Sequence, residues 1–71
     1  MNQALIKCQS VLLNKVKDLG FDYTIDSQSS EVNVIVPEID YNPNDYYVSA
    51  DEQLCNYYGL NYFQVNSIEL I

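Results

Sequence analysis

The feature that most constrains the fold is an alternation of apolar and polar residues that appears twice in a row. Valine occupies every second position of the segment 31–36, and Pro37 then ends the regular pattern. The segment 21–26 alternates in the same way, and four polar residues, 27–30, join the two segments. A period of two is typical of a strand with one buried face, so the chain is predicted to contain a β-hairpin. The inward side chains are expected to be Phe21, Tyr23 and Ile25 on the first strand and Val32, Val34 and Val36 on the second.

Two other segments have the three- and four-residue apolar spacing of an amphipathic helix. The first is predicted to run from Asn2 to Leu19 and to end at Gly20, and the second runs from about residue 50 to 58 and ends at Gly59. Ser49 and Glu52 match the capping box that begins a helix. The apolar face of the first helix would comprise Leu5, Cys8, Leu12, Val16 and Leu19.

The segment 61–71 is predicted to be a third strand. Its apolar alternation slips in phase at residues 66–67, where a bulge or a tight bend would restore the inward direction. The expected order is therefore α-β-β-α-β. We predict an α+β fold in which helices pack on a three-stranded antiparallel sheet. The 71 residues are expected to form a single acidic domain, because they leave no room for a second core.

Charge is distributed unevenly along the chain. The net charge is −7, and the three bases, Lys7, Lys15 and Lys17, all precede the first acid, Asp18. Residues 18–71 therefore carry ten acids and no base. A surface kept free of positive charge favours a basic partner and argues against direct binding of DNA or RNA. The alternative is that the charge serves solubility alone.

Several function classes lack their usual residues. The sequence has no histidine, arginine or tryptophan, so an enzyme, a cofactor or a metal site is not expected. The segment 40–51 has calcium-loop spacing at its start, but Asp45 stands where glycine is needed and Asp51 where glutamate is needed. Cys8 and Cys55 are expected to be reduced and buried. No segment is long and apolar enough to span a bilayer, so a cytoplasmic protein is expected.

Acids alternate with tyrosines at several points in the sequence, which contains seven tyrosines. A tyrosine side chain can remain at a wet surface and become an anchor when a partner covers it. The alternative is that most of the tyrosines lie at the rim of the core. Acids two residues apart on a strand are about 6.6 Å apart, which is on the order of the phosphate spacing in a nucleic-acid strand. The predicted partner-binding residues are Asp22, Asp26, Glu38, Asp40, Tyr41, Asp45, Tyr46 and Tyr47.

These patterns favour a small acidic inhibitor that occupies the basic nucleic-acid-binding surface of a target protein. Such a nucleic-acid mimic would be a phage anti-CRISPR or anti-restriction protein acting in the cytoplasm of the host cell. The alternative is an immunity protein or antitoxin that neutralises a cationic toxin, and the sequence does not separate the two. A structural subunit of a larger assembly is a third hypothesis.

Overall fold

The first element of the fold is a strand, and not the helix predicted for Asn2 to Leu19. In the computed structural model, which describes residues 2–44 and 47–71, strand β1 spans Gln3–Cys8 and helix α1 only Leu13–Leu19. The side chains of Ala4, Ile6 and Cys8 alternate along β1 and are fully buried. The helix prediction fails because a central strand buries these three side chains while its backbone pairs on both sides.

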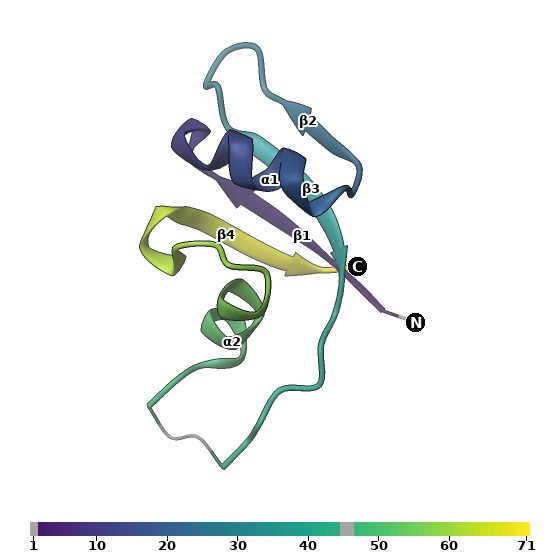
Figure 1. The fold of residues 1–71 in the computed structure, drawn as a ribbon, viewed down its shortest axis with the longest axis vertical. Coiled ribbons are helices and arrows are strands. Elements are labelled where there is room, and N and C mark those ends of the chain that lie inside the picture. Colours follow the sequence, from purple (N-terminus) through teal and green to yellow (C-terminus); the bar gives the residue numbers. More distant parts are fainter. Residues whose placement is uncertain (1, 45–46) are drawn as a thin grey trace.

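The described elements follow the order β-α-β-β-α-β, with a short 3-10 turn before α1 and before the last strand (Figure 1). The predicted hairpin is confirmed, and so is the second helix. The bounds are β1 Gln3–Cys8, η1 Ser10–Leu12, α1 Leu13–Leu19, β2 Tyr23–Ile25, β3 Val32–Pro37, α2 Ala50–Tyr57, η2 Tyr62–Gln64 and β4 Val65–Leu70.

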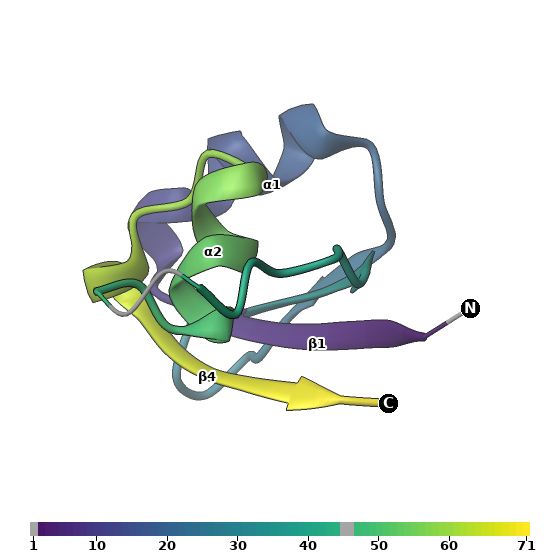
Figure 2. The same ribbon diagram turned by 90° about the horizontal axis from the view of Figure 1, so that it is seen from below.

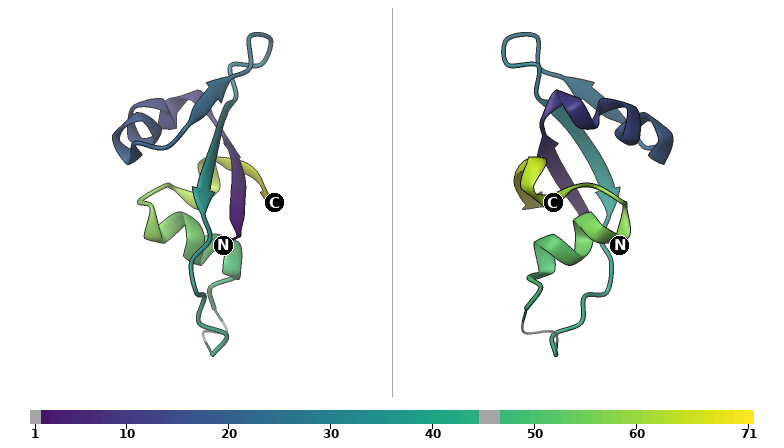
Figure 3. Two further views of the ribbon diagram at one scale, coloured as in Figure 1. Left: turned by 90° about the vertical axis from the view of Figure 1, so that its right-hand side faces the viewer. Right: turned by 60° about the vertical axis from the view of Figure 1, so that its left-hand side comes forward.

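The sheet has four strands in the order β2-β3-β1-β4, and every neighbouring pair is antiparallel. The α+β class is therefore correct, whereas the expected three strands and the α-β-β-α-β order are wrong. The connectivity is that of two interleaved β-α-β units, the split β-α-β arrangement. Both helices lie on one face of the sheet, and the described chain leaves the opposite face uncovered (Figures 2 and 3).

The core lies between this sheet and the two helices. Val32, Val34 and Val36 are fully buried, as predicted, whereas Tyr23 and Ile25 of β2 are 37% and 49% exposed. The register places these two side chains on the same face as the valines, but β2 is an edge strand and has a neighbour on one side only. The remaining buried residues are Ala4, Ile6, Cys8, Leu12, Val16, Leu54, Cys55 and Leu60.

Local signals in the sequence set the ends of both helices. The hydroxyl of Ser49 accepts a 3.2 Å hydrogen bond from the backbone N–H of Glu52, which begins α2 as predicted. Gly20 ends α1 with a φ of +81°, a left-handed conformation that disfavours other residues. Gly59 follows α2 with a φ of +71°, and the side chain of Lys15 lies directly across it.

The bulge predicted in the last strand is confirmed. Lys7 pairs with Ser67 but Cys8 pairs with Val65, so Asn66 is the extra residue of β4. The extra residue keeps Val65 and Ile68 packed against the core on the helix-covered face. None of the helices in the described ranges has the length and apolar character that crossing a bilayer requires.

Candidate functional site

Three of the predicted partner-binding residues lie on the segment that leaves the sheet at the end of β3. Its first residues are held on two sides. The hydroxyl of Tyr58 donates a 2.6 Å hydrogen bond to the carbonyl of Pro37, and the N–H of Glu38 donates a 3.1 Å bond to the carbonyl of Asn2. The backbone that carries Glu38 is therefore anchored both to α2 and to the N-terminal segment.

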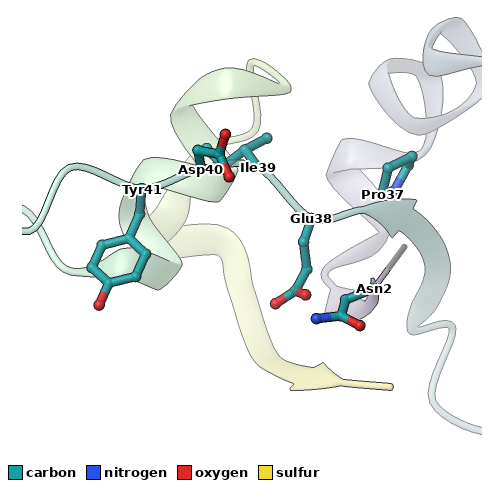
Figure 4. Close-up of a pocket in the computed structure, with 6 residues that line it drawn as sticks. All are labelled: Asn2, Pro37, Glu38, Ile39, Asp40 and Tyr41. Carbon is teal, nitrogen blue, oxygen red and sulfur yellow. The ribbon is translucent and has the colours of Figure 1, made fainter.

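An open hollow of about 600 Å³ lies beside this segment (Figure 4). Glu38 and Tyr41 project to the same side of the segment, with the Glu38 carboxylate toward Asn2, whereas Asp40 projects to the other side. Asp40 and Tyr41 are exposed and Glu38 is half-buried. All three residues line the hollow, but only Glu38 and Tyr41 lie on the same side of the segment.

Two more hollows adjoin the same segment and add residues that the sequence-based prediction left out. One, of about 110 Å³, places Glu38 and Tyr41 beside Asp51 at the start of α2. The other, of about 450 Å³, places Glu38 and Asp40 beside three aromatic side chains, Phe21, Tyr57 and Tyr58. We call Glu38, Asp40, Tyr41 and Asp51 the acidic end. Tyr57 and Tyr58 were visible in the sequence as tyrosines that follow acids, but no sequence signal brings Phe21 to this site.

The aromatic side chains at this site form a small cluster. The ring of Tyr58 meets the rings of Tyr57 and Phe21 edge to face, with centroid distances of 4.9 and 5.8 Å. Tyr57 is 69% exposed, so its ring is the part of this cluster that a partner could contact. Burial, the main cause, and the neighbouring Tyr57 raise the pKa of the Tyr58 hydroxyl. Tyr58 is therefore neutral near pH 7 and remains a hydrogen-bond donor to Pro37.

One side chain of α2 fixes the loop that follows the acidic segment. The amide nitrogen of Gln53 donates to the carbonyls of Asn42 and Val48, at 3.0 and 3.1 Å. Its amide oxygen accepts a 2.7 Å hydrogen bond from the N–H of Asn42. Gln53 thus holds the loop at two points, one on each side of residues 45–46. No sequence pattern singled out Gln53, because its partners are backbone groups.

Asp22 and Asp26 do not join the acidic end. Asp26 lies at the turn between β2 and β3, whereas Glu38 follows the opposite end of β3 (Figure 1). Asp22 lines a separate groove of about 110 Å³ on the uncovered face of the sheet, beside Leu5 and Ile35. The single row of acids expected from the sequence is therefore divided over the molecule.

The Asp26 carboxylate already has backbone partners. It accepts hydrogen bonds from the N–H groups of Gln28, at 2.8 Å, and Ser29, at 3.4 Å. These two bonds hold the pKa of Asp26 below its usual value, and the bond from Gln28 has the larger effect. The carboxylate of Asp26 is charged, but it is engaged in the hairpin turn.

The rest of the predicted set lies farther along the same loop. Asp45 and Tyr46 lie outside the residues that the structure describes. Tyr47 is 95% exposed and Tyr41 is 55% exposed.

The three lysines lie on β1 and α1, which do not belong to the acidic end. Lys7 is on β1 and faces the uncovered side of the sheet, and Lys15 and Lys17 are on α1. Among the described residues, no lysine lines any of the three hollows around Glu38. The acidic end therefore presents negative charge without a neutralising base in its own walls.

One of the loop oxygens that resembled a calcium site is used within the protein. The Asn42 side chain accepts a 3.0 Å hydrogen bond from the N–H of Asn44. Within residues 2–44 and 47–71, no group of three or more acidic, cysteine or histidine side chains is placed to hold a metal ion. Cys8 and Cys55 are both buried and unbridged, Cys8 on β1 and Cys55 on α2.

No protein-family model, curated protein or solved structure matches this chain.

Proposed function

We propose that this chain is a small acidic inhibitor that occupies the basic nucleic-acid-binding surface of a target protein. One observation carries the proposal: ten acids and no base follow Lys17, and three of those acids gather where the anchored segment after β3 meets the start of α2. A groove built to bind phosphates attracts carboxylates at similar spacing. An anti-CRISPR or anti-restriction protein from a phage would have this role.

The anchoring of the site supports a binding function. Pro37 and Glu38 are held by hydrogen bonds, and Gln53 holds the following loop. A surface that is already ordered loses less conformational freedom when it binds. The exposed rings of Tyr41 and Tyr57 add flat apolar area beside the carboxylates, which suits the arginine and lysine stems of a basic partner.

Cleavage assays test the proposal directly. The probes are a purified RNA-guided nuclease and a purified restriction enzyme, each with its own DNA substrate. The test variant is Glu38→Gln/Asp40→Asn, and the matched control is Asp18→Asn/Glu69→Gln, which removes the same charge from exposed positions elsewhere. We expect the wild type and the control to inhibit a responsive nuclease, and the acidic-end variant to lose at least tenfold in inhibition.

Other outcomes would contradict the proposal. Equal loss of inhibition in the two variants would mean that total charge acts and that the acidic end has no special role. A gel shift of DNA by the chain itself would exclude a nucleic-acid mimic. Protection of cells from a cationic toxin, without inhibition of either nuclease, would favour the immunity-protein alternative.

A further inference from the structure

The outer edge of β4 has backbone groups that the described part of the sheet leaves unpaired. The strand stands last in the order β2-β3-β1-β4 and pairs with β1. The N–H of Ile71 donates a 2.8 Å hydrogen bond to the carbonyl of Gln3, which makes these two residues a hydrogen-bonded pair. Because hydrogen-bonded and non-hydrogen-bonded pairs alternate along an antiparallel ladder, the backbone groups of Ile68 and Leu70 point away from β1.

Two hollows adjoin β4, and Asp51 at the start of α2 lines both of them. The first, of about 330 Å³, lies between Asp51, the short turn η2 and the part of β4 that ends at Ile68. The second, of about 110 Å³, lies beside Leu70 and is also lined by Glu38. The carboxylates of the acidic end therefore lie next to the same edge whose backbone is unpaired.

The walls of these hollows also present apolar surface. The Phe63 side chain is 87% exposed in the first hollow, and the Leu70 side chain is 70% exposed in the second. Among the described residues, no lysine lines either hollow. A lysine or arginine from a partner can pack its aliphatic stem on such a surface while its charged head reaches a carboxylate.

We infer that the outer edge of β4 binds an extended, lysine- or arginine-rich segment of the partner protein, which adds a strand to the sheet in antiparallel orientation. The inference rests on the proposed function for the basic partner. Residues opposite Ile68 and Leu70 lie on the same face as these two side chains and turn their own backbone groups toward β4. Basic side chains at these alternate positions enter the two hollows, beside Asp51 and Glu38.

Charge and strand length favour this occupant and this edge. The chain has a net charge of −7, so a second copy is repelled where Asp51 and Glu38 adjoin β4, whereas a basic segment is attracted. The other edge strand, β2, has three residues, but β4 has six and contains no proline. A segment on β4 therefore gains main-chain hydrogen bonds as well as charge pairs.

A synthetic peptide tests the pairing on the wild-type protein. It alternates lysine with threonine over about eight residues, so that its lysines all lie on one face of a strand. We expect the NMR amide signals of Ile68 and Leu70 to shift as the peptide is added, up to about 1 mM, at low ionic strength. The outward amides of Tyr23 and Ile25 on the other edge are the internal control and should not shift.

Two N-methylated forms of the peptide separate strand pairing from charge attraction. Methyl groups on the lysine amides remove the donors that face β4, whereas methyl groups on the threonine amides lie on the outer side of the added strand. We expect the first form to bind at least tenfold more weakly and the second to bind like the parent. Equal binding of the two forms would overturn the inference, and so would shifts at Tyr23 and Ile25 in place of Ile68 and Leu70.

One charge in the hollows can be removed with a neighbouring control. Asp51→Asn should weaken peptide binding at least threefold, because Asp51 lines both hollows. Glu52→Gln removes the same charge from the same helical turn but from a side chain that lines neither hollow, and should change binding little. Equal effects of the two variants would mean that total charge attracts the peptide, which would contradict docking at this edge.

A backbone variant distinguishes this inference from the proposed function. Leu70→Pro removes an outward N–H that makes no bond to β1, and Leu70→Val keeps it. For a nuclease that the chain inhibits, the proline variant should inhibit at least tenfold less than the valine variant. If both inhibit alike while Glu38→Gln/Asp40→Asn does not, the edge inference is wrong and the proposed function stands. If no nuclease is inhibited but the peptide pairs with β4 as described, the proposed function fails and the edge inference stands.

Discussion

The hydroxyl of Tyr58 and the carbonyl of Pro37 form a 2.6 Å hydrogen bond that joins the end of α2 to the end of β3. The residues are far apart in the sequence, and the bond lies where the chain leaves the sheet and enters the acidic segment. The position of Glu38 therefore depends on a side chain of a different element.

Removal of this hydroxyl should lower stability. Tyr58→Phe keeps the ring contacts with Phe21 and Tyr57 but leaves the Pro37 carbonyl without its side-chain donor. We expect the free energy of unfolding to fall by about 1–2 kcal/mol, measured by urea denaturation. Tyr57→Phe is the control and should change it by less than about 0.5 kcal/mol, since Tyr57 is 69% exposed. Equal effects of the two variants would mean that the bond contributes nothing.

Loss of the Gln53 amide should loosen the loop while the core stays intact. Gln53→Ala removes three hydrogen bonds to backbone groups of Asn42 and Val48. We expect the amide of Asn42 to exchange at least tenfold faster by hydrogen-exchange mass spectrometry, with a stability loss of about 1–2 kcal/mol. The control is Gln28→Ala in the exposed hairpin turn, which should leave the loop amides unchanged. Unchanged exchange in Gln53→Ala would show that the loop is held by other contacts.

The buried thiol of Cys55 should make stability depend on alkaline pH. Burial, aided by the nearby acid Asp51, raises the pKa of Cys55 from 9.0 to about 11. Between these values the thiol ionises in the unfolded chain but not in the folded one, so stability is complete below pH 9 and falls as pH rises toward 11. Cys55→Ala should show a smaller fall over this range than the wild type in denaturation experiments at each pH.

A cavity control separates titration from lost packing in that experiment. Val16→Ala also shortens a fully buried side chain but removes no titrating group, so its alkaline fall should match that of the wild type. The same burial predicts that Cys8 and Cys55 react with a thiol reagent only after unfolding in urea. Rapid labelling of the native protein would contradict the buried position of both thiols.

Association with a basic partner should be steered by charge. Increasing the ionic strength from about 0.01 to about 0.15 M shortens the screening length from about 30 to about 8 Å. For a nuclease that the chain inhibits, we expect the on-rate to fall at least tenfold while the off-rate changes little, as measured by surface plasmon resonance. The acidic-end variant should show a weaker salt dependence than its charge-matched control. An on-rate that does not depend on salt would point to an apolar interface instead.

The parts of the fold that the sequence predicts correctly are those set by neighbouring residues. The valine alternation gives β3, Ser49 begins α2, and the phase slip gives the bulge at Asn66. Residues 3–8 are different, because they fit both a helical spacing through Leu5 and a strand alternation through Ile6. Pairing with β3 and β4 decides between these two patterns, and that pairing is not visible in the local sequence.

The candidate site could likewise be predicted only in part from the sequence. Glu38, Asp40 and Tyr41 are neighbours in the sequence, so their common location was predictable. Asp51 joins them only because α2 packs beside the segment, and Asp26 is separated from them by the length of β3. Distances between elements arise from the tertiary fold, which a charge pattern alone does not specify.

The central position of β1 has a consequence for the kinetics of folding. β1 is the first strand of the chain, but its partners are β3 and the last strand, β4, and the bond between Gln3 and Ile71 spans nearly all the residues between them. The entropy of closing such a large loop is lost before its contacts form, so folding should be slow for a domain of this size. During synthesis, one side of β1 stays unpaired until β4 has been made, which leaves the early chain exposed to pairing with other strands.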